Sequence, residues 1–135
     1  MLTHLLDTSV YCQPIKNRAH EAALQRWSAI PEVAIAISAI CHCEVTQGLM
    51  QRDSARYWAR YRAILEGRYP ILPFDAACAV ALAELQTGLK QRGRVKPFAD
   101  LMIAATARQH GLVIATLNAR DFRDVPGVAV EDWSS

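Results

Sequence analysis

The sequence predicts a single α/β domain over residues 1–135, arranged as three α/β/α layers around a parallel β-sheet. Two observations predict this architecture. Short apolar segments of strand length alternate along the chain with longer segments of helical periodicity. Two of the short segments, residues 33–37 and 112–115, are continuously apolar, which is typical of parallel strands covered by helices on both faces. No internal repeat or linker divides the chain, so one domain is expected.

The same pattern gives the expected elements in order. Strands are predicted over residues 2–6, 33–37, 69–74, 112–115 and 128–130. Helices are predicted over a short segment after residue 8 and over residues 18–28, 38–51, 53–67, 75–90 and 97–110. Each predicted helix therefore lies between two predicted strands or beside another helix, as a layered α/β domain requires.

Local signals mark several helix boundaries. Ser38 and Asp75 each precede a helical pattern and are predicted N-caps, while Thr8 or Ser9 can cap the short helix after the first strand. Pro97 suits the first turn of the helix that follows it. The composition around these boundaries thus supports the elements independently of their apolar periodicity.

The composition is that of a compact globular chain. Hydrophobic residues make up 52% of it and charged residues 21%, with a net charge of +2. No apolar run approaches the about 20 residues of a membrane span, and the N-terminus lacks a signal peptide, so a cytoplasmic protein without membrane contact is expected. The cysteines are predicted to be free, buried, small hydrophobic residues rather than disulfides or zinc ligands: Cys12, Cys41, Cys43 and Cys78.

Four acidic residues occupy positions that point inward or lie at the end of a strand. Asp7 and Asp121 follow predicted strands at their carboxyl ends, where parallel sheets bind ligands. Asp100 and Glu44 lie on apolar faces of predicted helices. Asp7 taken alone is equally well explained as a helix cap. The other acids are predicted to be surface or capping residues.

A cluster of four carboxylates favours metal-ion chemistry. The like charges repel one another, so their pKa values must rise or a cation must compensate them, and no basic partner is evident near them in the sequence. Ligands that are all oxygen select Mg²⁺, for which Mn²⁺ can substitute. A metal polarises a phosphodiester and lowers the pKa of a bound water. No histidine or serine–histidine pair near these elements offers nucleophilic catalysis instead.

The basic residues are mostly arginine, twelve against three lysines. Arginine suits phosphate and carboxylate partners because its planar fork binds two oxygens. Two sets are candidates for binding RNA or an acidic partner. One is Arg52, Arg56 and Arg60, spaced by four from the residue just before the helix predicted over 53–67, and the other is Arg92 and Arg94 in a basic loop. A solvated basic surface explains most of them equally simply.

Four motifs carry a resemblance to a known family. LLDTSV, ISAICHCEVTQG, PFADLMIAATA and TLNARDF, in this order and spacing, resemble PIN-domain ribonucleases, and among them the VapC-type toxins of bacterial type II toxin–antitoxin systems. The resemblance covers almost the whole chain. It implies a five-stranded parallel sheet and a Mg²⁺-dependent endoribonuclease that cuts structured RNA, such as tRNA or rRNA. It also implies a homodimer and inhibition by a cognate antitoxin whose tail occupies the site.

The resemblance also implies roles for particular residues. The family's four acids correspond to Asp7, Glu44, Asp100 and Asp121, as catalytic residues and metal ligands. The polar residues expected to support them are Thr8, Ser9, Thr116 and Asn118. The chain departs from the family at three places. Cys41 stands where the family often has threonine, His42 stands where it often has a small or apolar residue, and Lys96 and Pro97 replace an apolar–glycine pair. None of these departures removes an acid.

Two other functions stay open at the level of sequence. One is a non-catalytic RNA- or protein-binding module that kept the fold, although the four intact acids argue against it. The other is a phosphatase with Asp7 as nucleophile, but haloacid-dehalogenase-like enzymes have a second aspartate two residues on, where this chain has Ser9. Metal-dependent RNA cleavage is the function that the sequence favours.

Overall fold

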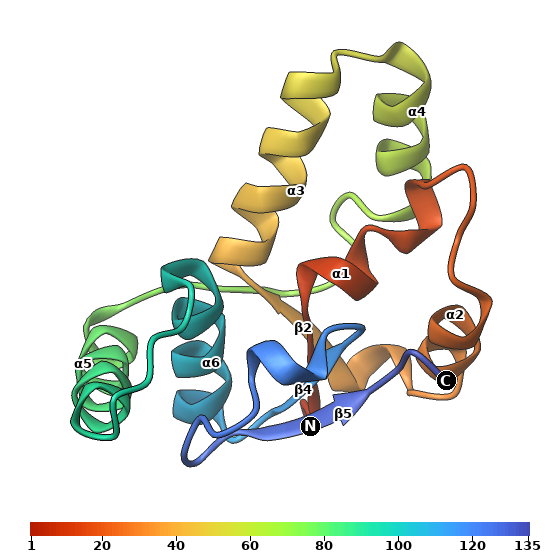
Figure 1. Ribbon diagram of the computed structural model, residues 1–135. Coiled ribbons are helices and arrows are strands. Elements are labelled where there is room, and N and C mark those ends of the chain that lie inside the picture. The colour runs from red at the N-terminus through yellow and green to blue at the C-terminus, as the bar shows by residue number, and fades with distance from the viewer.

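The computed structural model describes residues 1–135 as a three-layer α/β/α domain (Figure 1). Its five-stranded sheet has the order β3-β2-β1-β4-β5, and every pairing is parallel. The strands are β1 (His4–Leu6), β2 (Ile35–Ser38), β3 (Ile71–Leu72), β4 (Val113–Thr116) and β5 (Ala129–Asp132). The predicted fold class and parallel sheet are therefore confirmed, with β1 at the centre.

Six α-helices and three short 3₁₀ turns connect the strands. The helices are α1 (Thr8–Tyr11), α2 (Glu21–Ser28), α3 (Ala39–Arg52), α4 (Ala55–Ile64), α5 (Ala76–Gln91) and α6 (Phe98–His110). The 3₁₀ turns are η1 (Gln13–Ile15), η2 (Glu32–Ala34) and η3 (Ala119–Asp121). None of the helices has the length and apolar character needed to cross a membrane.

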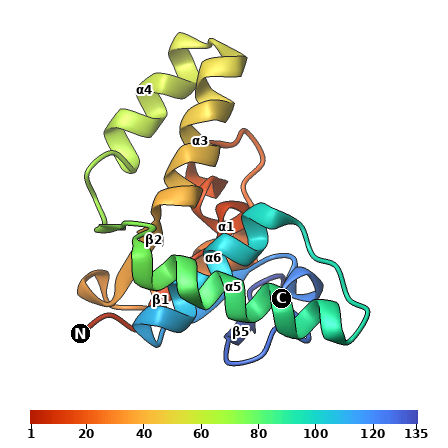
Figure 2. The same ribbon diagram turned by 90° about the vertical axis from the view of Figure 1, so that its left-hand side faces the viewer.

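Each face of the sheet is covered by its own hydrophobic core. Successive strand residues point to opposite faces, so Leu5 lies in the core beneath α5 and α6, and Leu6 in the core shared with α1 to α4. Both views place α5 beside α6 on one side, while α3 and α4 form an antiparallel pair that projects from the opposite end (Figures 1 and 2). The carboxyl edge of the sheet lies between these two groups of helices.

The main capping predictions are confirmed. The Ser38 hydroxyl accepts a hydrogen bond from the backbone N–H of Cys41 at 3.0 Å, and Asp75 accepts one from Cys78 at 3.0 Å. Gly111, with φ of 65°, ends α6 in the left-handed conformation that glycine adopts without steric cost. These local contacts fix where α3, α5 and α6 begin or end.

Several expectations are corrected. Thr8 and Ser9 do not cap α1, because their hydroxyls donate to Glu44 and Asp7 instead. Arg52 lies in the last turn of α3 rather than in the following helix, since the chain turns through a left-handed Asp53 with φ of 48°. The cysteines are free, as predicted, but Cys43 is exposed on the outer face of α3.

Candidate functional site

The structure gathers the four predicted acids at the carboxyl edge of the sheet. Asp7 follows the central strand β1, and Asp121 ends η3 just after β4. Glu44 lies in the second turn of α3, which starts directly after β2. Asp100 lies in the first turn of α6, whose N-terminus reaches this edge because α6 runs antiparallel to the strands. Four separate elements therefore contribute one carboxylate each.

The pKa of Asp100 shows that the four carboxylates interact. It is raised from 3.8 to about 6, first because the side chain is partly buried, and then because the negative charges of Asp7, Asp121 and Glu44 lie near it. Such charge effects act over short distances only. The acids thus form one cluster, which we call the acid cluster: Asp7, Glu44, Asp100 and Asp121.

Asp7 is the most firmly held member of the acid cluster. It is buried, and its Oδ2 accepts hydrogen bonds from the hydroxyls of Ser9 at 2.9 Å and Thr116 at 2.8 Å. The Ser9 hydroxyl in turn accepts the backbone N–H of Leu117 at 3.0 Å. No protein group donates to Oδ1. One oxygen of this carboxylate is therefore fixed by the protein, while the other is free for a cation or a water molecule.

Glu44 is held by the start of α1. The Thr8 hydroxyl donates to its Oε1 at 2.6 Å, which joins α1 to α3 across the carboxyl edge. Hydrogen bonds accepted by an ionised carboxylate are among the stronger hydrogen bonds in proteins. The predicted supporting roles of Thr8, Ser9 and Thr116 thus correspond to direct contacts with the acids. Asn118 contributes only its backbone N–H, which donates to the Thr116 hydroxyl at 2.9 Å.

Lys96, which the sequence marked only as a departure from the family pattern, lies beside the acid cluster. The charge of Lys96 opposes the rise in the pKa of Asp100. Its Nζ donates to the carbonyl oxygen of Arg120 at 2.9 Å, so the side chain spans from the start of α6 to η3, next to Asp121. Lys96 forms no ion pair with an acid, but its charge acts on Asp100, so the expectation of no basic residue near the acids is wrong. The available signal was its place just before the N-cap of the helix that carries Asp100.

The first predicted arginine set surrounds one tyrosine. The guanidinium groups of Arg52 and Arg60 lie over the ring of Tyr57, at 4.3 and 5.5 Å from its centroid. Arg56 and Arg60 also donate to Oδ1 of Asn17, at 2.7 and 2.9 Å. A cavity of about 160 Å³ connects this set to Glu44. We call it the α3–α4 cavity, and its lining includes Thr8, Glu44, Gly48, Arg52 and Tyr57.

The second predicted set lies elsewhere. Arg92 donates to the carbonyl oxygen of Asp124 at 3.0 Å, and Arg94 forms an ion pair with the carboxylate of Asp124 at 2.9 Å. These residues belong to the loop between α5 and α6, at the opposite end of the molecule from α4 (Figures 1 and 2). The predicted arginines therefore form two separate surfaces, one on each side of the acid cluster.

The chemistry of the acid cluster fits a hard divalent cation. All its donors are carboxylate oxygens, flanked by hydroxyls, with no thiolate or imidazole among them. No group of three acidic, histidine or cysteine side chains is arranged to hold one ion directly. Mg²⁺ keeps several of its waters and is bound through only one or two carboxylates, so it would not need three direct protein ligands here. A cation at this position would offset the part of the rise in the pKa of Asp100 that comes from the neighbouring negative charges, which add to the effect of burial.

Comparisons with known proteins identify the fold. The family model described as PIN domain matches residues 4–128. The chain is 35% identical to the tRNA(fMet)-specific endonuclease VapC of Shigella flexneri, covering 99% of this chain and 100% of the relative. The crystal structure of FitAcB from Neisseria gonorrhoeae matches with a TM-score of 0.88 and 28% identity, over 97% of this chain and 98% of that one. DNA-bound VapBC from Salmonella typhimurium matches with a TM-score of 0.82 and 31% identity, over 98% and 99%.

The matches agree with the resemblance carried by the four motifs. The family model spans β1 to β4 and all four elements that supply the acid cluster. The chain belongs to the PIN domain family, as one of its VapC-type toxins.

Proposed function

We propose that this protein is a Mg²⁺-dependent endoribonuclease that cuts structured cellular RNA, such as tRNA or rRNA, and acts as a toxin. The observation that carries the proposal is the crowding of four carboxylates at one edge of the sheet, with the pKa of Asp100 raised to about 6. Such a cluster is costly unless it binds a cation. The relative from Shigella flexneri is named a tRNA(fMet)-specific endonuclease, which supports RNA as the substrate.

The four residues of the acid cluster have different proposed roles in hydrolysis. When bound, Mg²⁺ supplies positive charge beside the scissile phosphodiester and lowers the pKa of a water molecule in the site. Asp7, through its free Oδ1, and Asp100 are the proposed direct ligands, and Asp121 acts through water. Glu44 completes the metal site or orients the attacking water, because the Thr8 hydroxyl occupies only its Oε1.

A cognate antitoxin and a second copy of the chain are the proposed protein partners. Solved relatives include FitAcB of Neisseria gonorrhoeae and VapBC of Salmonella typhimurium, which supports an antitoxin for this chain as well. A segment of the antitoxin that carries arginine can enter the acid cluster, replace the charge of the metal and exclude RNA. The homodimer is an expectation from the family, and light scattering of the purified protein tests it.

The decisive experiment incubates purified, antitoxin-free protein with total cellular RNA, in Mg²⁺, in Mn²⁺ and in EDTA. Discrete cleavage products in either metal, and none in EDTA, are the expected result, and mapping their ends identifies the RNA and the cut. Asp100→Asn should abolish the products while the protein stays folded. RNA binding without cleavage in both metals would instead identify the protein as a non-catalytic binding module.

A further inference from the structure

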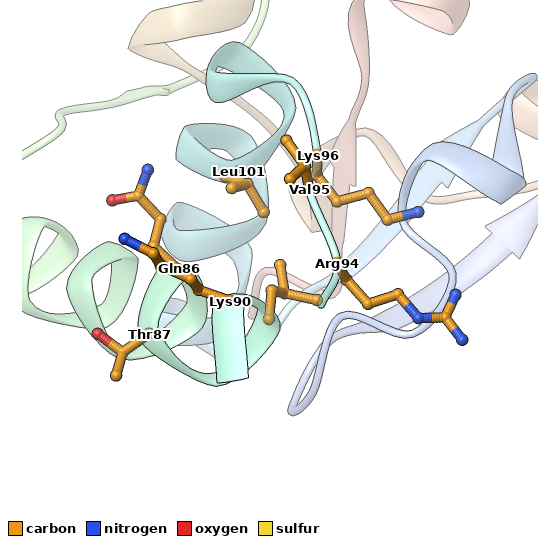
Figure 3. A pocket seen from close by; sticks show the side chains of 8 residues that line it. Gln86, Thr87, Lys90, Arg94, Val95, Lys96 and Leu101 are labelled. Atoms are coloured by element: carbon orange, nitrogen blue, oxygen red, sulfur yellow. The ribbon is translucent and has the colours of Figure 1, made fainter. Parts of the chain in front are cut away.

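A second cavity lies between the end of α5 and the start of α6. It has a volume of about 380 Å³, and we call it the α5–α6 pocket (Figure 3). Gln86, Thr87 and Lys90 line it from α5, while Arg94 and Lys96 line it from the loop. Its apolar lining comes from Leu89, Val95 and Leu101. Three of its lining residues are thus basic and none is acidic, and the charged ends of Arg94 and Lys96 extend out of the pocket (Figure 3).

Lys96 joins this pocket to the acid cluster. Its stem lines the pocket, and its Nζ reaches the carbonyl oxygen of Arg120 at 2.9 Å, beside Asp121 (Figure 3). Arg94 extends in the same direction, to the carboxylate of Asp124 at 2.9 Å. The Lys96 side chain therefore links the pocket to η3, which ends at Asp121.

The lining combines the two chemistries that a nucleotide needs. Lys90 forms no ion pair, so its ammonium group is free for an anion. Val95 is 94% exposed and offers apolar surface on which a base can lie. The side chains of Gln86 and Thr87 add polar groups within reach of a base edge or a ribose. Protein sites that bind single-stranded nucleic acid pair cationic groups with surfaces for the bases, most often aromatic ones, and here the surface is aliphatic.

The acid cluster itself creates the need for this site. RNA carries one negative charge per nucleotide, and the carboxylates repel every phosphate that a cation does not neutralise. Phosphates next to the scissile one must therefore be held by cationic side chains. Resting on the proposed function, we infer that the α5–α6 pocket is a subsite of the nuclease that binds one RNA nucleotide flanking the cut, with Lys96 on its phosphate and Val95 against its base.

The test measures binding of a short, labelled, single-stranded RNA by fluorescence anisotropy in EDTA, over a range of NaCl concentrations. Lys96→Gln and Lys90→Gln remove charge from the pocket, and each should weaken binding and lower the salt slope by about 0.7 for each phosphate that the variant no longer neutralises. Thr87→Trp fills the pocket from an exposed position without changing charge, so it should weaken binding at an unchanged slope. Arg108→Gln, at the opposite end of α6 from Asp100, is the matched control and should bind RNA like the wild type.

The outcomes separate this subsite from the proposed nuclease activity. Wild-type cleavage in Mg²⁺, together with unchanged RNA binding by Thr87→Trp and Lys96→Gln, overturns the subsite and leaves the nuclease standing. RNA binding that depends on the pocket, in a protein that leaves RNA intact in Mg²⁺, supports the subsite and refutes the nuclease. If polyglutamate rather than RNA binds in a way that Lys96→Gln abolishes, the pocket contacts protein and the inference is wrong. Circular dichroism confirms that each variant is folded.

Discussion

Thr116, the last residue of β4, donates its hydroxyl to Oδ2 of Asp7 at 2.8 Å, and so connects the ends of two neighbouring strands. Ser9 donates to the same oxygen at 2.9 Å. The two hydroxyls fix the orientation of a buried carboxylate before any cation arrives. Pre-organisation of this kind is what a metal site needs if its ligands are not to move during binding.

Thr116→Val tests this arrangement, because valine keeps the shape of threonine but cannot donate. We expect a loss of about 1 kcal/mol in the free energy of unfolding, and a cleavage rate reduced roughly 10-fold as Asp7 loses part of its support. Urea unfolding and RNA cleavage measure the two effects.

Thr46→Val is the matched control. The Thr46 hydroxyl is buried without a partner, so its removal should leave stability unchanged or slightly higher. Equal losses in both variants would contradict the role of the Thr116 bond.

Asp100 should make the metal-free protein less stable as the pH rises. Its folded pKa of about 6 exceeds the ordinary value of 3.8, so the folded state binds the proton more tightly. The free energy of unfolding therefore falls between about pH 4 and pH 6, and the penalty is complete above that range. Asp100→Asn removes the charge, and should raise the free energy of unfolding at pH 7 by roughly 1–2 kcal/mol after solvent screening.

Thermal unfolding in EDTA at pH 4, pH 5 and pH 7 measures the effect of Asp100. Wild type and Asp100→Asn should differ least at the lowest pH. Mg²⁺ should then stabilise the wild type more than the variant, because the ion binds the folded state and has one ligand fewer in Asp100→Asn. A variant that is less stable than the wild type at pH 7 in EDTA would show that burial of the Asp100 charge beside the other acids does not destabilise the folded protein.

The sequence predicts the members of the acid cluster better than the contacts that hold it. Asp7 and Asp121 follow parallel strands, and because the carboxyl ends of parallel strands meet at one edge, their proximity follows from the fold class alone. The cap at Ser38 is equally predictable, since it depends on residues three positions apart. The contact between Thr8 and Glu44 joins residues 36 positions apart, and its formation depends on how α1 packs against α3.

Lys96 illustrates the same limit. Its spacing from Asp100 suggests proximity, but its reach to Arg120 depends on the path of the loop between α5 and α6. The arginines show the limit most clearly. Spacing by four predicts one continuous helical stripe. The helix α3 ends at Asp53, however, so Arg52 approaches Tyr57 from α3 and Arg60 approaches it from α4. Local propensity predicts elements, whereas their meeting points depend on tertiary packing.

The arginine set around Tyr57 should contribute to RNA binding through charge. Replacing Arg52, Arg56 and Arg60 together by glutamine should weaken binding for all RNA sequences alike, and should lower the salt slope by about 0.7 for each phosphate that is no longer neutralised. The matched control replaces the same three residues by lysine, which keeps the charge and should keep most of the slope. A salt slope that is unchanged in the glutamine variant would mean that these arginines only pack around Tyr57 and Asn17.

The α3–α4 cavity should receive the antitoxin, and Gly48 allows this to be tested without disturbing the fold. A Cβ at Gly48 meets nothing within 4 Å, and the residue lines the cavity between Glu44 and Tyr57. Gly48→Leu should therefore fill much of the space while stabilising α3 by roughly 0.5–1 kcal/mol, because leucine is a better helix former than glycine. A blocked cavity excludes an apolar antitoxin segment on its way to the acid cluster.

Growth on co-expression with the antitoxin measures this effect. Wild-type protein should be neutralised, whereas Gly48→Leu should still arrest growth and should bind the purified antitoxin more weakly. Gly88→Leu is the matched control, because a Cβ at Gly88 also meets nothing within 4 Å and α5 lies away from the cavity. It gains the same helix propensity and should remain neutralised.

Cleavage of a short RNA by both variants separates a failure of neutralisation from a failure of activity. If the antitoxin neutralises Gly48→Leu as well as Gly88→Leu, the α3–α4 cavity is not its binding site.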